Sequence, residues 1–334
     1  MQRVPVIDLS RWFGLDRAER EAVARQVDRA CTEWGFLIVR GHGIDPAIMQ
    51  EVAAVTHEFF DLPLDEKMQC DSSGRAGGRR YYRLESKSHA RTRGNEAAPG
   101  DLRETFFAGV EPVPGDPIRS ASAAPGHYAP NIWPAPPWHM RKTRETYSRA
   151  CDALCHDLLH LAAYALELPA GWFDDRIDRP ISRFGAQHYP PLERPPAPGQ
   201  VRSGAHTDFG TLTLLMTEDK PGGLQVTDMD GRWHDMKPVP GAFIVNLGDR
   251  MARWTNDRWR STPHRVVNPP LEAGAAARRL SIVYFHTPNY DACIECIPSR
   301  TDADHPPLYP PILAGEHLAE KLRQVDSVST GRTA

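Results

Sequence analysis

The segment from Ile181 to about Pro288 constrains the fold more than any other part of the chain. It consists of short β-rich runs that are separated by Gly, Pro, Asn and Asp. Strands at this spacing, broken by turn residues, indicate an all-β barrel or sandwich. The predicted strands lie at 184–189, 210–216, 224–226, 242–247, 265–267 and 280–285.

The first 65 residues combine strand and helix signals. A β-rich run at 4–9 precedes a charged stretch, about 17–33, whose apolar residues have helical spacing. A second apolar run at 36–39 ends at Gly41-His-Gly43, and Asp45-Pro46 then supplies the N-cap and first-turn signals of a helix to about residue 60. We therefore expect an αβ module at the N-terminus.

The remaining segments indicate how the unit is organised. Residues 71–103 and 110–137 look like irregular covering segments, a long helix at about 138–168 should back the core, and a helical tail near 315–325 should pack outside. We expect an N-terminal module with covering loops (1–135), a backing helix (136–180), a β core (181–290) and a C-terminal extension (291–334). No linker divides them, so one compact α+β unit is predicted.

Composition excludes several classes of partner. The formal net charge is −3 and the pI is near 6.5, so no global field favours nucleic acid or an anionic membrane. No apolar run approaches the roughly 18 residues of a membrane span, and a cytoplasmic protein is expected. Six scattered cysteines indicate reduced thiols, and Cys293-Ile-Glu-Cys296 lacks the second pair that a zinc site needs.

The residues that carry chemistry begin with Gly204-Ala-His206-Thr-Asp208. An imidazole and a carboxylate two residues apart on an extended segment point to the same side, where one metal can take both. His264, at the start of a later β-rich run, is the candidate third ligand. Two histidines and one carboxylate form the facial triad of non-haem iron(II) oxygenases, although zinc accepts the same ligands.

A second pair points to an anionic cosubstrate beside that metal. Arg279 and Ser281 are also two apart on a strand, and a guanidinium with a hydroxyl suits a carboxylate. Tyr189 can add a phenol from a neighbouring strand. By strand alternation Val283 and Phe285 face the same side as Ser281, where Phe285 lines a substrate pocket or fills the core.

Two other patterns carry alternative interpretations. Between 75 and 93 there are seven Lys or Arg residues against one Glu, which indicates either a solvated loop or a site for an anionic substrate at Arg79 and Arg80. His156 and His160 have the i, i+4 spacing of a helical zinc pair, but no Glu follows the first histidine and no third ligand is evident nearby. We therefore interpret that pair as structural or surface residues.

The chain resembles the isopenicillin N synthase-like family of iron(II), 2-oxoglutarate-dependent dioxygenases over most of its length. The motifs follow in family order: VPVIDLS, Trp34-Gly-Phe36, Val39-Arg-Gly-His-Gly43, Asn131-Ile-Trp-Pro134, Tyr189-Pro-Pro191, HTDFGTLT from His206, GGLQV from Gly222 and VNLGD from Val245. Gln187 stands where many members have Asn, and Thr255-Asn-Asp257 replaces a common Ser-Asn-Gly turn. Neither departure touches a proposed ligand.

The resemblance implies a double-stranded β-helix (jelly-roll) core with flanking helices. It also implies that His206, Asp208 and His264 hold Fe(2+), and that Arg279, Ser281 and Tyr189 bind the distal carboxylate of 2-oxoglutarate. No catalytic residue beyond the metal ligands is expected. Oxygen, and ascorbate as a stimulant, complete the expected requirements.

The expected reaction is hydroxylation of a small molecule, with release of succinate and CO2, in secondary metabolism such as antibiotic biosynthesis. Desaturation or cyclisation uses the same chemistry, whereas halogenation is disfavoured because Asp208 fills the position that chloride would need. The alternatives are a 2-oxoglutarate-independent iron oxidase of the same fold, a His-Asp-His zinc hydrolase, and a catalytically silent β-barrel that binds a metabolite.

Overall fold

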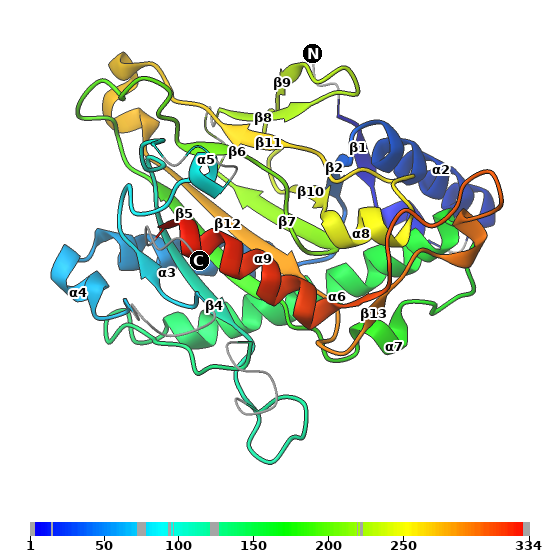
Figure 1. The fold of residues 1–334 in the computed structure, drawn as a ribbon. Helices are drawn as coiled ribbons and strands as arrows, with labels where there is room; N and C mark the ends of the chain where they lie inside the picture. Colours follow the sequence, from blue (N-terminus) through cyan, green and yellow to red (C-terminus); the bar gives the residue numbers. More distant parts are fainter. Residues whose placement is uncertain are drawn as a thin grey trace.

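Two β-sheets form the core of the computed structural model, which describes residues 4–14, 16–71, 78–92, 95, 97–120, 127–218, 220 and 223–329, with backbone alone for 322–329. The larger sheet has the order β1-β2-β10-β7-β12-β5-β4-β3 (Figure 1). Its strands are β1 Val6–Asp8, β2 Phe36–Arg40, β10 Phe243–Leu247, β7 Leu212–Thr217, β12 Arg279–His286, β5 Arg183–Tyr189, β4 Glu104–Gly109 and β3 Tyr81–Tyr82. All neighbours pair antiparallel except β1 and β2.

The smaller sheet has the order β6-β11-β8-β9, with β6 Ser203–His206, β11 His264–Val266, β8 Leu224–Thr227 and β9 Trp233–Asp235. Strands of both sheets line one internal cavity, so the sheets face each other across it. This is an α+β jelly-roll core, as the sequence predicts. A short pair, β13 Cys293–Ile294 and β14 Ile312–Leu313, lies in the C-terminal extension.

Helices cover the outer face of the larger sheet. The long helix α6 (Met140–Ala165) packs on β12, α2 and α3, and its buried side carries Leu154, Leu158 and Leu161. Figure 1 shows α6 running beneath the strands, with α2 and α3 near its two ends. The other helices are α1 Ser10–Phe13, α2 Arg17–Glu33, α3 Pro46–Asp61, α4 Leu64–Met68, α5 His89–Thr92, α7 Asp174–Ile177, α8 Asp249–Trp254 and α9 Ala314–Ser329.

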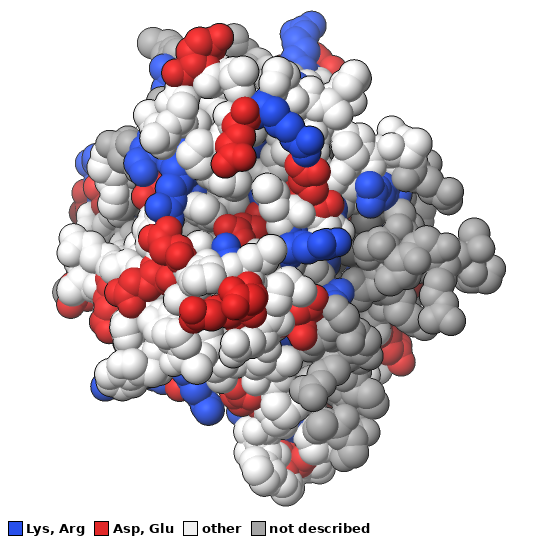
Figure 2. Space-filling view, turned by 90° about the vertical axis from the view of Figure 1, so that its left-hand side faces the viewer, with Lys and Arg blue, Asp and Glu red and all other residues white. Residues whose placement is uncertain are grey.

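The helix boundaries follow the local signals. Asp16 caps α2 by accepting hydrogen bonds from the amides of Ala18 and Glu19, and Asp45 caps α3 with Pro46 in the first turn. Among the described residues, no helix is long and apolar enough to cross a membrane. Acidic and basic side chains are interspersed on the face that Figure 2 shows, in keeping with the small net charge.

Strand β4 is the main element that the sequence patterns did not predict. It lies between β3 and β5, so the N-terminal 135 residues supply four strands to the same sheet as the core. Its burial does not alternate, since both faces are covered, and its first residue, Glu104, is a buried carboxylate. Lys67, Tyr81 and His188 all bind that carboxylate, which keeps the pKa of Glu104 below its usual range despite burial. The predicted domain boundaries remain a prediction.

The C-terminal helix also differs from expectation. We expected an element packed on the outside, but α9 packs against α5 and places Leu318 in the wall of a pocket. The guanidinium of the fully buried Arg250 links α9 to the segment after β6. It donates to the carbonyl oxygen of Phe209 and to that of Ala314, the first residue of α9. The tail is therefore part of the pocket's enclosure.

The buried Lys67–Glu104 ion pair predicts a measurable loss of stability. Replacing Lys67 with Met should lower the free energy of unfolding by about 3 kcal/mol or more, because an uncompensated carboxylate stays buried. Denaturant unfolding of the two proteins measures the difference. Arg141→Ala, which removes an exposed pair with Glu145, is the control and should change little. Equal effects of the two substitutions would contradict the prediction.

Candidate metal centre and adjoining pockets

The pairing of β6 with β11 brings two histidines together. His206 ends β6, His264 begins β11, and the two are direct partners in the antiparallel register. Asp208 follows two residues after His206, as the sequence pattern requires. Nε2 of His206 lies 3.9 Å from Oδ1 of Asp208, and Nε2 of His264 lies 3.9 Å from Oδ2. One ligand atom from each residue falls within 4.8 Å of the others, a spacing that suits a metal ion.

Backbone carbonyls fix which nitrogen of each ring faces the cluster. Nδ1 of His206 lies 2.8 Å from the carbonyl oxygen of Gly204, and Nδ1 of His264 lies 3.2 Å from that of Thr262. A carbonyl oxygen only accepts hydrogen bonds, so each Nδ1 carries the hydrogen. Both Nε2 atoms therefore face the same point, which is the arrangement that two metal-binding histidines need.

Asp208 is anchored from the opposite sheet. Its Oδ2 accepts hydrogen bonds from the Thr213 hydroxyl on β7, at 2.7 Å, and from the Asn246 amide on β10, at 2.8 Å. Burial raises the pKa of Asp208, but His264, His206 and these two donors outweigh burial and leave the pKa below its usual range. The group is a carboxylate at neutral pH.

The environment also keeps His206 neutral. Burial and the neighbouring His264 lower the pKa of His206 to about 3, against the weaker opposite effect of Asp208. A neutral imidazole is the form that binds metals, so no proton must leave at neutral pH. The donor set of two histidines and one carboxylate therefore fits iron(II).

Two hollows, a cavity and a pocket, meet at His206 and Asp208, and His264 lines the cavity alone. The inner cavity lies between the sheets and is lined by residues that include Tyr189, Ser203, Arg279, Ser281 and Val283. The outer pocket opens on the other side of the cluster and is bounded by β4, β5 and α9. His206, Asp208, Gln187 and Phe285 line both hollows.

The inner cavity brings together all three residues that the sequence suggested for an anion. Tyr189 and Arg279 are direct partners across β5 and β12, and Ser281 lies two residues farther along β12. The buried Arg279 guanidinium donates to the Thr217 hydroxyl, at 3.0 Å from Nε and 2.6 Å from Nη2. The same cavity is lined by this buried cation and by the His-Asp-His group, an arrangement that suits a dicarboxylate.

Ser203 is a further residue of this cavity that the sequence patterns missed. It lines the inner cavity from β6, and its buried hydroxyl has no hydrogen-bond partner among the described residues. Buried hydroxyl groups nearly always have a partner, so this one has capacity for a ligand. A serine three residues before a candidate metal ligand was the available signal.

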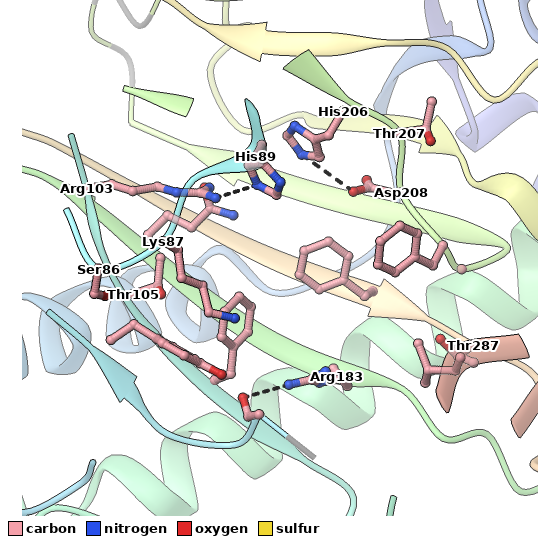
Figure 3. Close-up of a pocket in the computed structure, with 18 of the residues that line it drawn as sticks. Ser86, Lys87, His89, Arg103, Thr105, Arg183, His206, Thr207, Asp208 and Thr287 are labelled. Carbon is pink, nitrogen blue, oxygen red and sulfur yellow. Dashed lines mark hydrogen bonds and ion pairs between the residues drawn. The ribbon is translucent and has the colours of Figure 1, made fainter. Parts of the chain in front are cut away.

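The outer pocket combines aromatic walls with cations. Its aromatic residues are Tyr82, Phe107, Phe209 and Phe285, and its basic residues are Arg83, Lys87, Arg103 and Arg183. Among the described lining residues, Asp208 is the one carboxylate. Figure 3 shows His206 and Asp208 at one end, Arg183 at the other, and Lys87 with aromatic rings between them.

His89 and Arg103 line the outer pocket next to His206, and the sequence analysis predicted neither of them as a site residue. The ring of His89 stacks on that of His206, with centroids 3.8 Å apart and planes 1° from parallel. Nη2 of Arg103 lies 2.5 Å from Nε2 of His89, and Nη1 donates to Oε1 of Gln187 at 2.7 Å. Gln187 also accepts from the Tyr189 hydroxyl at 2.7 Å, so one amide oxygen joins the two hollows.

The structure does not bring Arg79 and Arg80 to the outer pocket, which corrects the prediction that they contact a substrate. Arg79 is buried and donates to the carbonyl oxygens of Val110 and Ala129. Arg80 pairs with Asp71 at 3.2 Å and lies over the Tyr82 ring. The cations of this segment that line the pocket are Arg83 and Lys87, while Arg75 and Arg93 lie outside the described residues.

Two other histidines near the strands have structural partners. His188 binds Glu104 and accepts from Arg278, and His286 binds the Thr211 hydroxyl at 2.6 Å. The six cysteines are free thiols, and Cys293 is exposed whereas Cys296 is buried. None of these residues lines either hollow.

A jelly-roll core with a His-Asp-His cluster beside a cavity that contains a buried arginine, and with a second pocket next to it, is the architecture of a non-haem iron(II) oxygenase. Family models agree with that class. The model described as "non-haem dioxygenase in morphine synthesis N-terminal" matches residues 4–136, and the model of the 2OG-Fe(II) oxygenase superfamily matches residues 181–288. The chain belongs to the 2OG-Fe(II) oxygenase superfamily, within its isopenicillin N synthase-like branch.

Curated relatives extend the match over nearly the whole chain. A 2-oxoglutarate-Fe(II) type oxidoreductase of Emericella nidulans is 34% identical over 325 residues, which cover 96% of this chain and 89% of the relative. Validamycin A dioxygenase of Streptomyces hygroscopicus subsp. limoneus is 31% identical, with 96% and 86% covered. The dioxygenase citB of Monascus ruber is 36% identical, with 86% and 85% covered.

Solved structures give the same result. A full-length Neurospora crassa protein that was crystallised in complex with alpha-KG superposes with a TM-score of 0.83 at 30% identity, covering 96% of this chain and 95% of that one. The protein is therefore an oxygenase that uses Fe(2+), 2-oxoglutarate and O2. This result decides against the zinc hydrolase and the silent barrel.

The anchor on Asp208 generates a prediction. Asn246→Ala should weaken iron(II) binding about 10–100-fold, because the carboxylate loses a donor that holds its orientation. Anaerobic titration with iron(II), followed by the visible band that forms with 2-oxoglutarate, measures the affinity. Gln225→Ala on β8, whose amide bonds Asp235 on the surface, is the control. Equal affinities in all three proteins would refute the anchoring role.

Proposed function

We propose that this oxygenase hydroxylates a small organic anion with an aromatic or alicyclic body. The observation that carries the proposal is the junction of the two hollows at His206 and Asp208, beside His264. The inner cavity contains Arg279, and the outer pocket is lined by aromatic rings and cations. The cosubstrate and the substrate therefore have separate binding sites that adjoin one metal position.

In this proposal His206, Asp208 and His264 hold iron(II), and Arg279, Ser281 and Tyr189 bind the distal carboxylate of 2-oxoglutarate, with Ser203 as an added contact. When bound, iron and 2-oxoglutarate supply the oxidant that breaks a substrate C–H bond, and succinate and CO2 are released. Phe285 separates the two seats, since it lines both. Val283 faces the cosubstrate side.

The charge of the outer pocket supports an anionic substrate. Arg183 lies over the Phe107 ring at 5.3 Å, and Lys87 lies over the Tyr82 ring at 3.8 Å. Cations that are partly removed from water beside aromatic walls are stabilised when an anion binds. The walls themselves favour a flat or apolar body, because they offer large apolar surfaces.

The far end of the pocket is built for close polar contact. A Cβ atom added to Gly78, whose φ is +58°, would lie 3.0 Å from the Tyr82 hydroxyl oxygen and 3.3 Å from Nη2 of Arg183. The two polar groups therefore converge beside this glycine. The Tyr82 hydroxyl is buried and has no hydrogen-bond partner among the described residues. We place the substrate's anionic group here, with the oxidised carbon at the metal end.

The biological setting is also part of the proposal. Relatives that include citB of Monascus ruber and validamycin A dioxygenase support a role in secondary metabolism. Six free cysteines support a cytoplasmic location, which cell fractionation tests. Desaturation or cyclisation would start from the same C–H cleavage, and mass analysis of the product separates these outcomes.

Replacement of Arg279 tests the cosubstrate seat. Arg279→Leu should raise the KM for 2-oxoglutarate about 10–100-fold, because a charge-assisted pair of hydrogen bonds is lost, and should leave iron(II) binding intact. Succinate formation at varied 2-oxoglutarate gives the value. Arg265→Leu is the matched control, since that arginine bonds Gln225 on the outer side of β11. An unchanged KM for 2-oxoglutarate in the Arg279→Leu protein would contradict the proposed cosubstrate site.

A substrate panel tests the anion. Aryl and cycloalkyl carboxylic acids, each paired with its primary amide, are screened for succinate formation above the rate without substrate. The acids should be preferred, and Arg183→Leu should raise their KM about tenfold or more while substrate-free 2-oxoglutarate turnover stays unchanged. Arg232→Leu, which alters an exposed arginine that pairs with Asp230 outside the pocket lining, is the control. Amides that react as well as the acids would refute the anionic substrate.

A further inference from the structure

Two histidines on the helix α6 belong to a second group of metal-ligating residue types, which is separate from the proposed iron ligands. His156 and His160 are separated by one helical turn, so both imidazoles project from the same side of α6. The sequence patterns offered no third ligand. The fold supplies one, because Asp174 at the start of α7 faces both rings.

The three side chains converge on one point. Oδ1 of Asp174 lies 2.7 Å from Nε2 of His160 and 3.6 Å from Nε2 of His156, and the two ring centroids are 4.3 Å apart. A tetrahedral zinc ion with bonds of about 2.0–2.1 Å places its ligand atoms about 3.3 Å from one another. The two distances from Oδ1 of Asp174 to the histidine nitrogens, 2.7 and 3.6 Å, lie on either side of that value. An ion can therefore bind after small side-chain rotations.

The turn before α7 holds the carboxylate in place. Gly171 has a φ of +73°, and a Cβ atom there would lie 2.6 Å from Oδ2 of Asp174. The Asp174 amide also donates to the Gly171 carbonyl oxygen at 2.9 Å. The carboxylate is thus folded over this turn with Oδ1 directed at the two histidines. All three side chains are a third to a half exposed, so an ion and its water ligand have access from solvent.

We infer that His156, His160 and Asp174 form a second metal site that takes a borderline divalent cation such as Zn²⁺, with water as the fourth ligand. Two imidazoles and one carboxylate are the ligand types that zinc prefers, and a helical pair one turn apart needs little reorganisation to bind. The site joins α6 to α7, which leads into β5, the strand that carries Arg183 and Tyr189. Its role is to clamp the backing helix to the core sheet.

The test uses zinc alone and removes the proposed iron site first. In a protein with His206→Ala and Asp208→Ala, calorimetric titration should show one equivalent of Zn²⁺, and zinc should raise the Tm by a few degrees because the ion binds only the folded state. Adding His160→Ala should abolish both effects. His156→Gln should do the same, which guards against a single variant that fails to fold.

The matched control is His305→Ala. His305 is an exposed histidine that pairs with Asp302 at 3.1 Å, and its removal should leave zinc stoichiometry and the Tm rise unchanged. An equivalent of zinc that persists after both His160→Ala and His156→Gln, or no zinc binding in the background protein, would overturn the second site. Neither result bears on the proposed oxygenase function, because succinate formation is measured separately on the iron-loaded wild-type protein.

Discussion

The hydrogen bonds from Thr213 and Asn246 to Asp208 are the interaction on which the site depends. The carboxylate belongs to the segment after β6 of the smaller sheet, whereas its two donors stand on neighbouring strands of the larger sheet. The smaller sheet and its extension carry all three proposed ligands, and the larger sheet supplies the donors that fix the carboxylate. The donors fix the orientation of the Asp208 carboxylate relative to the two histidines that β6 and β11 bring together. The arrangement of the proposed metal ligands therefore depends on how the two sheets pack.

Charge is distributed so that the proposed iron ligands lie between two cationic regions. Arg279 closes the inner cavity, and Arg183 and Lys87 line the outer pocket. The proposed iron ligands carry a single negative charge, on Asp208. A dianionic cosubstrate and an anionic substrate would each meet an opposite charge at the far end of their hollow and the same ion at the near end, which orients both molecules.

Period-two alternation was enough to pair four of the candidate site residues, although it missed Ser203 on β6. It placed His206 with Asp208 and Arg279 with Ser281, because each pair shares a strand or its direct extension. It failed where residues enter from irregular segments: His89 comes from a four-residue helix, and Asp174 reaches α6 through a turn. Likewise β4 was missed because its buried Glu104 needs partners on three other elements, which no local pattern records. Long-range contacts decide such positions.

Gln187 has a consequence for how this enzyme can change. Its amide oxygen accepts from Arg103 on the outer side and from Tyr189 on the inner side, and the residue walls both hollows. A substitution that reshapes the outer pocket through Arg103 therefore also alters the acceptor available to Tyr189. In the proposed assignment, substrate range and cosubstrate affinity are therefore coupled through a single atom. Variants selected for a new substrate are expected to show an altered KM for 2-oxoglutarate unless a second change compensates.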